Sequence, residues 1–414
     1  MSENRNSLRP PFWPHVGVGL VAVLVAAIAT FVLENTRLMR ALEMINLDAL
    51  LISQNGTAST KVALVDIDAL DYKQFFNRTS PLEPECVKGI IEAIAKSGAR
   101  AIIVDLDTSD WSTLDLPQWL SSKSMMHTPV VWARAISSES VPDAHLEDVV
   151  GRNGAALIND PTNASICWGV PEVLDSGGLI RSYHSYVALR DDSAPSLARA
   201  AVLAYEAEPF PASLEAATGQ RQGNCALLAQ DARPGDLRLK ILKYGHRFPR
   251  YHARDVLNVA GEPAYNALKG KIVVLGGTFP EAKDAYWTPI GRRDGAEILE
   301  NAIEAESSGS TVHEPSSLSL ALVEITLGMV IVLATYPFRR RLITTVMVLS
   351  ITAALVFVLC FLLYESTSYF FSFAPLLVGL LIHEEIVGRH EPRGKQAGLE
   401  PQVPANAQSS EKKP

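Results

Sequence analysis

The chain has 414 residues with 48% apolar side chains, and its 45 acidic residues exceed its 37 basic ones to give a net charge of −8. This length allows two average domains or one large domain with additional parts. The acidic balance excludes nucleic acid as an expected partner, since phosphate binding requires a basic face.

Four apolar runs are each long enough, as helices, to cross a bilayer. We predict one transmembrane helix before the central part of the chain and three after it: residues 14–33, 317–336, 342–363 and 369–387. No small-residue cleavage site follows the first run, which favours a permanent anchor over a signal peptide. Apolar residues at helical spacing from Leu38 to Ile52 predict that this anchor continues as a helix into the next domain.

Residues 34–315 alternate strand and helix patterns, which predicts an α/β domain with a mixed, mainly parallel sheet flanked by helices. Within it, residues 61–106 form a strand–helix–strand unit with a right-handed crossover. The expected strands are residues 61–67, 101–106, 129–136, 155–158, 179–189, 236–243 and 272–275, and the expected helices are residues 84–97, 195–208 and 295–307.

Basic residues predict the orientation of the four apolar helices. Arginines fill the short segment 337–341, and the N-terminal residues 1–13 and the tail 388–414 carry further basic residues, whereas the loop 364–368 has none. We therefore expect a bacterial inner-membrane protein with both termini in the cytoplasm and residues 34–315 in the periplasm or outside the cell. The polar, proline-containing tail is expected to be disordered.

Cys86, Cys167 and Cys225 lie in the expected exported domain, and Cys360 lies in the third apolar run. An exported domain can form one disulfide and leave one thiol. The chain has no Cys-x-x-Cys spacing, so we favour unpaired cysteines that pack as small apolar residues, and their pairing stays open.

Residues 270–291 read GKIVVLGGTFPEAKDAYWTPIG, and a helix pattern, GAEILENAIEA, follows them. This stretch resembles the type-two CHASE domain, an extracellular sensory domain found on bacterial cyclases and histidine kinases. Further blocks resemble the family in the expected order: KVALVDIDALD, SGARAIIVDLDTSD, SGGLIRSYHSYV, PSLARAAVLAYE and FPRYHARDVL. Arg181 is in place, but Gly177 stands where the family usually has aspartate and Leu299 where it often has histidine.

The resemblance implies a non-enzymatic sensory domain, and the layout of one span before the domain and three after it is also similar to the family. Family members commonly continue into a cytoplasmic output domain, for which residues 388–414 are too short. We therefore expect a separate signalling or membrane partner protein. Homodimerisation is expected because relatives feed outputs that work as dimers. No cofactor is expected.

Parallel strands end at one edge of a sheet, where ligands often bind. Backbone N–H groups of the glycine pair in Gly276-Gly277-Thr278 can face an anion, although the spacing matches neither nucleotide-binding motif. The candidate ligand-binding residues are Asp66, Asp105, Gly276, Gly277, Lys283, Asp284 and Thr288. The acids among them, with Asp107, form an alternative Mg²⁺ or Ca²⁺ site. Because such acids more often cap a turn, we expect no metal.

Asp66-Ile67-Asp68 also has the D-x-D form of haloacid-dehalogenase-type phosphatases, in which the first carboxylate attacks phosphorus beside Mg²⁺. Thr108 or Ser109 would supply the hydroxyl, and Lys283 with Asp284 the later groups. The residues after Asp68 do not fit this pattern, so a Mg²⁺-dependent extracytoplasmic phosphatase is the alternative, not the favoured function.

Within the second apolar run, Glu324 is an ionisable residue at membrane depth. Such a group is costly in a bilayer and usually faces a partner, so we assign it to helix–helix coupling. The interpretation favoured by the whole sequence is a membrane-anchored sensor or scaffold that binds a ligand or protein outside and signals through a separate partner.

Overall fold

The computed structural model describes residues 36–53, 58–108, 128–133, 166–171, 173–176, 178–188, 193–206, 239–257, 266–309, 342–367 and 370, with isolated positions at 21–28, 119 and 319–330. The chain divides into two compact units. One comprises Met1–Met44, Pro315–Cys360 and Phe371–Pro414, and the other comprises Ile45–Glu314 with Phe361–Phe370.

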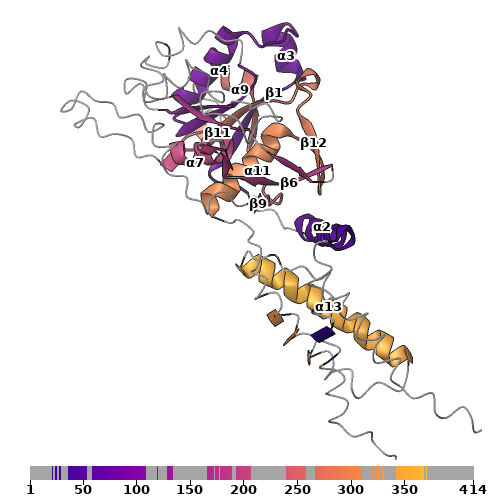
Figure 1. Ribbon diagram of the computed structural model, residues 1–414. Coiled ribbons are helices and arrows are strands. Elements are labelled where there is room, and N and C mark those ends of the chain that lie inside the picture. The colour runs from indigo at the N-terminus through magenta and orange to yellow at the C-terminus, as the bar shows by residue number, and fades with distance from the viewer. Residues whose placement is uncertain are drawn as a thin grey trace, which may run out of the picture. The chain divides into compact units, whose positions relative to one another are not determined.

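The second unit is an α/β domain built on a six-stranded sheet (Figure 1). In sheet order its strands are β10 (Arg250–His252), β1 (Val62–Ile67), β11 (Ile272–Gly277), β2 (Ala101–Asp105), β3 (Val130–Ala133) and β4 (Ile166–Gly169). All neighbouring strands run parallel. The predicted α/β class with a mainly parallel sheet is confirmed. However, β11 lies between the two strands of the predicted strand–helix–strand unit.

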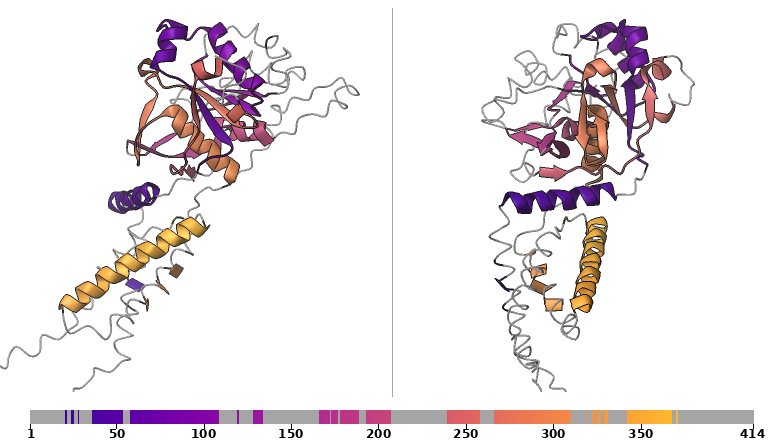
Figure 2. Two further views of the ribbon diagram at one scale, coloured as in Figure 1. Left: turned by 180° about the vertical axis from the view of Figure 1, so that it is seen from behind. Right: turned by 90° about the vertical axis from the view of Figure 1, so that its right-hand side faces the viewer.

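Helices cover both faces of this sheet (Figure 2). On one side lie α3 (Ala69–Phe76), α4 (Pro84–Lys96) and α9 (Ala253–Leu257), and on the other lie α7 (Leu197–Glu206) and α11 (Gly295–Ser308). Alternate strand residues enter alternate cores: Val65 and Leu275 join the first, whereas Leu64 and Val274 join the second. Burial on both faces explains why these strands are continuous apolar runs in the sequence.

Helix α4 shows how the sequence determines an element. Pro84 occupies the first turn, where a missing N–H costs nothing. Val87, Ile90, Ile91 and Ile94 are fully buried on one face, as a period of 3.6 residues requires. The helix ends before Gly98, whose positive φ of 81° is accessible to glycine at little cost.

Three small antiparallel sheets complete the described part of the domain: β5 (Leu174–Ser176), β6 (Leu179–His184) and β9 (Leu239–Ile241); β7 (Tyr186–Ala188) and β8 (Ser193–Pro195); and β12 (Ala285–Thr288) and β13 (Gly291–Asp294). The predicted strand 179–189 is therefore two strands, interrupted at Ser185. Strand 236–243 is shorter than predicted among the described residues, and strand 155–158 lies outside them.

Helix α2 (Arg37–Ile52) confirms the helix predicted after the first apolar run. Its C-terminal part belongs to the α/β domain. There Asp48 accepts two hydrogen bonds from Arg181 of β6, at 2.6 Å from Nε and 2.8 Å from Nη2. This bidentate ion pair fixes the end of α2 to the domain.

A small core lies next to this ion pair. Leu47, Leu50 and Leu51 of α2 pack with Ile241, Tyr364 and Phe370. Tyr364 ends the apolar part of α13 (Leu342–Thr367), and the Lys243 ammonium lies 5.4 Å from its ring centre. The segment Phe361–Phe370 is therefore part of the α/β domain.

The remaining unit contains the first residues of α2 and most of α13. Within the described part of the chain, no helix is both long and apolar enough to span a bilayer. The other three predicted spans lie largely or wholly outside the described residues, and the four-span layout stays a prediction.

Candidate functional site

Two predicted site residues, Asp66 and Asp105, lie on either side of a third, Gly276. In the sheet register Asp66 pairs with Gly276, and Gly276 pairs with Asp105. Because adjacent strands are about 4.8 Å apart, the two aspartate backbones are separated by about 10 Å. All three residues occupy the carboxyl end of their strands, on the face that α11 covers.

The glycine pair has a packing role and is not a turn. Both residues still belong to β11, so the predicted strand end at Leu275 is wrong. A Cβ on Gly276 would lie 2.5 Å from the Ala296 Cβ, and one on Gly277 would lie 2.7 Å from the Phe279 ring. The first turn of α11 can approach the sheet this closely only over a residue without a side chain.

Arg250 joins the sheet end to α11. Its Nη2 donates to Asp66 Oδ2 at 3.1 Å, and its Nη1 donates to Glu297 Oε1 at 2.8 Å. The same Asp66 oxygen accepts from Thr278 Oγ1 at 3.0 Å. Glu300, the next buried acid of α11, has its pKa raised well above the ordinary value by burial and by neighbouring Glu297. The first two turns of α11 are thus electrostatically linked to β1 and β10.

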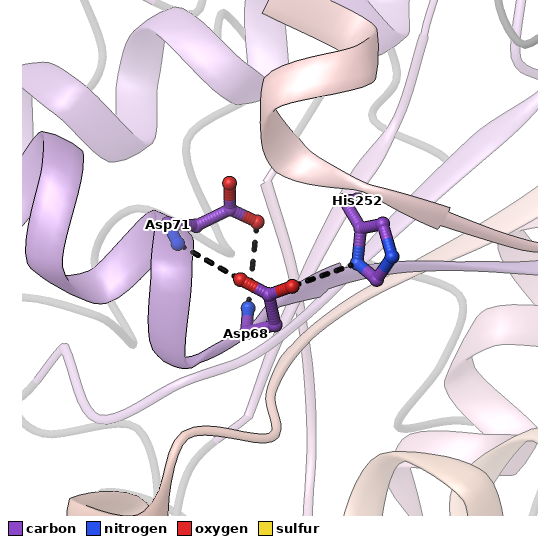
Figure 3. Close-up of side chains that lie close together, drawn as sticks. All are labelled: Asp68, Asp71 and His252. Atoms are coloured by element: carbon purple, nitrogen blue, oxygen red, sulfur yellow. Dashed lines mark hydrogen bonds and ion pairs between the residues drawn. The ribbon is translucent and has the colours of Figure 1, made fainter.

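His252 Nδ1 faces both Asp66 and Asp68, and Figure 3 shows its contact with Asp68. Its Nδ1 is 3.0 Å from Asp66 Oδ1 and 3.3 Å from Asp68 Oδ2. Neither His252 Nδ1 nor Asp66 Oδ1 has a hydrogen-bond partner of acceptable geometry. Asp66 is almost completely buried, with 1% of its side chain exposed, which makes the missing partner costly.

Asp68 caps helix α3. It accepts hydrogen bonds from the backbone N–H groups of Leu70 and Asp71, both at 2.8 Å, and Arg254 Nη1 lies 2.9 Å from each of its oxygens. Arg254 Nη1 also lies 3.0 Å from buried Asp71. Burial alone would raise the pKa of Asp68, but the hydrogen bonds from Asp71 and Arg254 outweigh it and hold the pKa below the ordinary value. Burial raises the pKa of Asp71.

Asp105 forms a second acidic group with Asp284. Burial and the nearby Asp284 carboxylate raise the pKa of Asp105 to about 7. Burial also raises the pKa of Asp284, against a hydrogen bond from Tyr286 that lowers it. The Asp284 carboxylate lies against Gly295, where a Cβ would overlap it. This position, beside the first residue of α11, favours negative charge.

The other predicted residues lie apart from these contacts. Lys283 is exposed, with a positive φ of 53°, after the short 3-10 turn Pro280–Ala282. Thr288 is buried and donates to the Gly291 carbonyl at 2.6 Å within the β12–β13 hairpin. Glu324 lies outside the described residues.

Sequence reasoning missed the basic half of the site. Arg250, His252 and Arg254 come from the single stretch RYHAR, in which alternate residues are of basic types. This alternation, which runs through β10 into the first turn of α9, was an available signal. The acidic partners of these residues, however, are about 180 residues away in the chain. The Asp68–Asp71 capping box is the second missed feature.

The two acids of the D-x-D pair lie in different environments. Asp66 is buried and accepts hydrogen bonds from Arg250 and Thr278, whereas Asp68 caps α3. The hydroxyl that donates to Asp66 belongs to Thr278, which directly follows β11. The phosphatase alternative expected Thr108 or Ser109 in this role. Thr108 is buried, and Ser109 lies outside the described residues.

The fold and the site together define an α/β domain whose charged strand ends contact helix α11. The family model described as the CHASE2 domain matches residues 21–336, so the chain belongs to the CHASE2 family. CHASE2 domains are extracytoplasmic sensory domains, and the predicted resemblance is confirmed. No curated protein and no solved structure matched the chain.

The cysteines correct one prediction. Cys167 is disulfide-bonded, whereas Cys86 and Cys360 are free. The favoured interpretation, that all three cysteines of residues 34–315 are unpaired, is therefore wrong for Cys167. A lasting disulfide is typical of exported proteins.

Proposed function

We propose that the chain is a membrane-anchored extracytoplasmic sensor or scaffold, which binds a ligand or protein outside the cytoplasm and signals through a separate partner protein. Membership of the CHASE2 family supports the sensory role. The proposed layout has four transmembrane helices, at the four apolar runs, with both termini in the cytoplasm of a bacterium.

The observation that carries this proposal is the position of α11. Its first turns contact the charged strand ends through Arg250–Glu297 and through Ala296 on Gly276. Its last residue, Ser308, is shortly followed along the chain by the apolar run 317–336. A ligand that prefers one arrangement of the Arg250 contacts would bias the position of α11, and only such a preference can shift the equilibrium.

Helix α2 is the second connection between the domain and an apolar run. Its beginning follows residues 14–33, and its end is held by the Asp48–Arg181 ion pair. We infer that sensing changes the position of α11 relative to α2. In the full protein this becomes a movement of the first and second apolar runs.

Two observations support an exported domain with this orientation. The first is the disulfide at Cys167. The second is the packing of Tyr364 and Phe370 against Ile241, because the loop 364–368 is the one expected on the same side as the domain. Homodimerisation and the partner protein belong to the same proposal, with the apolar runs and Glu324 as the docking region.

Thiol labelling of intact cells tests the orientation. A Lys283→Cys variant in a Cys86→Ser background places a thiol on an exposed turn. We expect a membrane-impermeant maleimide, added after the outer envelope is permeabilised, to label this variant but not the Cys86→Ser parent. Labelling only after the inner membrane is broken would contradict the proposal.

Affinity purification of the full-length protein from its native membrane tests the signalling role. We expect a stoichiometric cytoplasmic or membrane partner in the mass spectrum. A clean homo-oligomer with no other protein would contradict the separate-partner part and leave the sensory domain to be explained differently.

A further inference from the structure

Asp68, Asp71 and His252 offer three ligand atoms within 4.8 Å of one another (Figure 3). They come from the start of α3 and the end of β10, which the parallel pairing of β1 with β10 brings together. Two carboxylates and one imidazole form a mixed oxygen and nitrogen donor set. First-row divalent cations such as Zn²⁺ and Mn²⁺ accept such a set, whereas Ca²⁺ prefers six to eight oxygens.

An acidic cluster alone does not establish a metal site, but a fourth residue points to a ligand. Only 1% of the Asp66 side chain is exposed, and its Oδ1 has no hydrogen-bond partner. That oxygen lies 3.0 Å from His252 Nδ1, which also lacks a hydrogen bond. A buried, unsatisfied carboxylate oxygen is unfavourable unless a cation or donor compensates it.

The spacing of these atoms is also the spacing of ligands that share one cation. His252 Nδ1 lies 3.0 Å and 3.3 Å from its two carboxylate neighbours, yet forms a well-aligned hydrogen bond with neither. Ligand atoms bound to one ion at about 2.0 to 2.2 Å stand about 3 Å apart in the same way.

Arg254 holds the same carboxylates. Its Nη1 lies 2.9 Å from both oxygens of Asp68 and 3.0 Å from Asp71 Oδ1. A metal ion would therefore compete with this guanidinium for the carboxylates of Asp68 and Asp71. Because Arg254 is on α9 and partly exposed, its side chain can turn into solvent without opening the core.

We propose that Asp68, Asp71 and His252 bind a divalent transition-metal ion in exchange with the Arg254 guanidinium, with Asp66 Oδ1 beside the same imidazole nitrogen, Nδ1. This proposal concerns binding alone and does not depend on signalling. Of the five residues it names, only Asp66 was among the predicted ligand-binding residues.

Isothermal titration of the full-length protein in detergent, without a histidine tag, tests the proposal with ZnCl₂ and MnCl₂. We expect saturable binding of a single ion per chain, tighter for Zn²⁺ than for Mn²⁺ as the general order of stability requires. CaCl₂ is expected to bind far more weakly. His252→Ala should lower the Zn²⁺ affinity at least about tenfold, whereas the control His246→Ala should not change it.

Two further variants separate ligand loss from misfolding. Asp68→Asn should weaken binding while keeping helix α3 capped, because asparagine is as good an N-cap as aspartate. Arg254→Met should tighten binding, since the competing cation is removed. Absence of saturable binding, or binding that survives both His252→Ala and Asp68→Asn, would overturn the proposal. Either result would leave the sensory role of α11 untouched, because that role is tested by the movement of the helix.

Discussion

Gly276 of β11 lies directly beneath Ala296 of α11, so closely that a Cβ on the glycine would stand 2.5 Å from the alanine Cβ. This contact places the first turn of α11 against the strand ends that carry Asp66 and Asp105. The missing side chain at Gly276 therefore sets the distance between the candidate site and α11.

Gly276→Ala should push the first turn of α11 away from the sheet and destabilise the protein by about 1–3 kcal/mol, the usual cost of overpacking. Thermal unfolding of the full-length protein in detergent measures this effect. Gly89→Ala is the matched control, because Gly89 lies within α4 with nothing within 4 Å of its added Cβ. We expect the control to be neutral or stabilising. Equal stability of Gly276→Ala and wild type would contradict the packing role.

Loss of the Asp48–Arg181 pair should loosen the end of α2. Arg181→Met removes two hydrogen bonds to a carboxylate that is 21% exposed, and we expect a loss of about 1.5–3 kcal/mol. Lys96→Met, which breaks the exposed i,i+4 pair with Glu92, should cost less than about 0.5 kcal/mol. Similar unfolding curves for the two variants would show that the buried pair has no special role.

Stability should fall as the pH rises towards 7 because of Asp105. Its pKa is about 7 in the folded protein against an ordinary value of 3.8, so between these values the folded state keeps a proton that the unfolded chain has lost. The free energy of unfolding should therefore fall by up to about 1.4 kcal/mol per pH unit in this range. Asp284 and Tyr286 are the titratable groups that interact with Asp105.

Asp105→Asn should therefore raise the melting temperature at pH 8 and change it little at pH 4, where the aspartate is protonated in the folded protein. In Asp105→Asn the stability should still fall with rising pH, though less steeply, because the pKa of Asp284 is also raised. A variant that shifts the melting temperature equally at both pH values would refute the raised pKa of Asp105.

Alkylation of the denatured, unreduced protein should modify Cys86 and Cys360 but leave Cys167 unlabelled. Peptide mapping by mass spectrometry identifies the labelled positions. After reduction, label should appear at Cys167 as well. Label at Cys167 before reduction would show that this cysteine is not in a disulfide. The disulfide would then no longer support an exported domain.

Much of the α/β domain follows from local patterns. Buried parallel strands are continuous apolar runs, and α4 has a proline start, a four-position apolar face and a glycine end, so β1, β2 and α4 were predicted within a few residues. The insertion of β11 between β1 and β2 was not predictable in this way. Nothing in residues 61–106 shows that a strand from residues 272–277 will separate their two strands.

The site was half predictable for the same reason. Asp66 and Asp105 are acids at the ends of apolar strands, which is a local signal. Nothing in the sequence distinguishes Arg250 and Arg254 from surface arginines. Only the pairing of β10 with β1 brings Arg250 to Asp66 and Arg254 to Asp68. The glycine pair was interpreted as a turn because the sequence does not show the close approach of Ala296.

Hydrogen–deuterium exchange of the full-length protein tests the central claim, that Arg250 couples the strand ends to α11. Arg250→Met removes the contacts to Asp66 and Glu297, and Arg100→Met, which removes a contact to the Tyr205 carbonyl, is the control. We expect faster exchange along α11, from Gly295 to Ser308, in the first variant only, with α4 unchanged in both. Faster exchange confined to β10 and α9, with α11 as protected as in the wild type, would contradict the account.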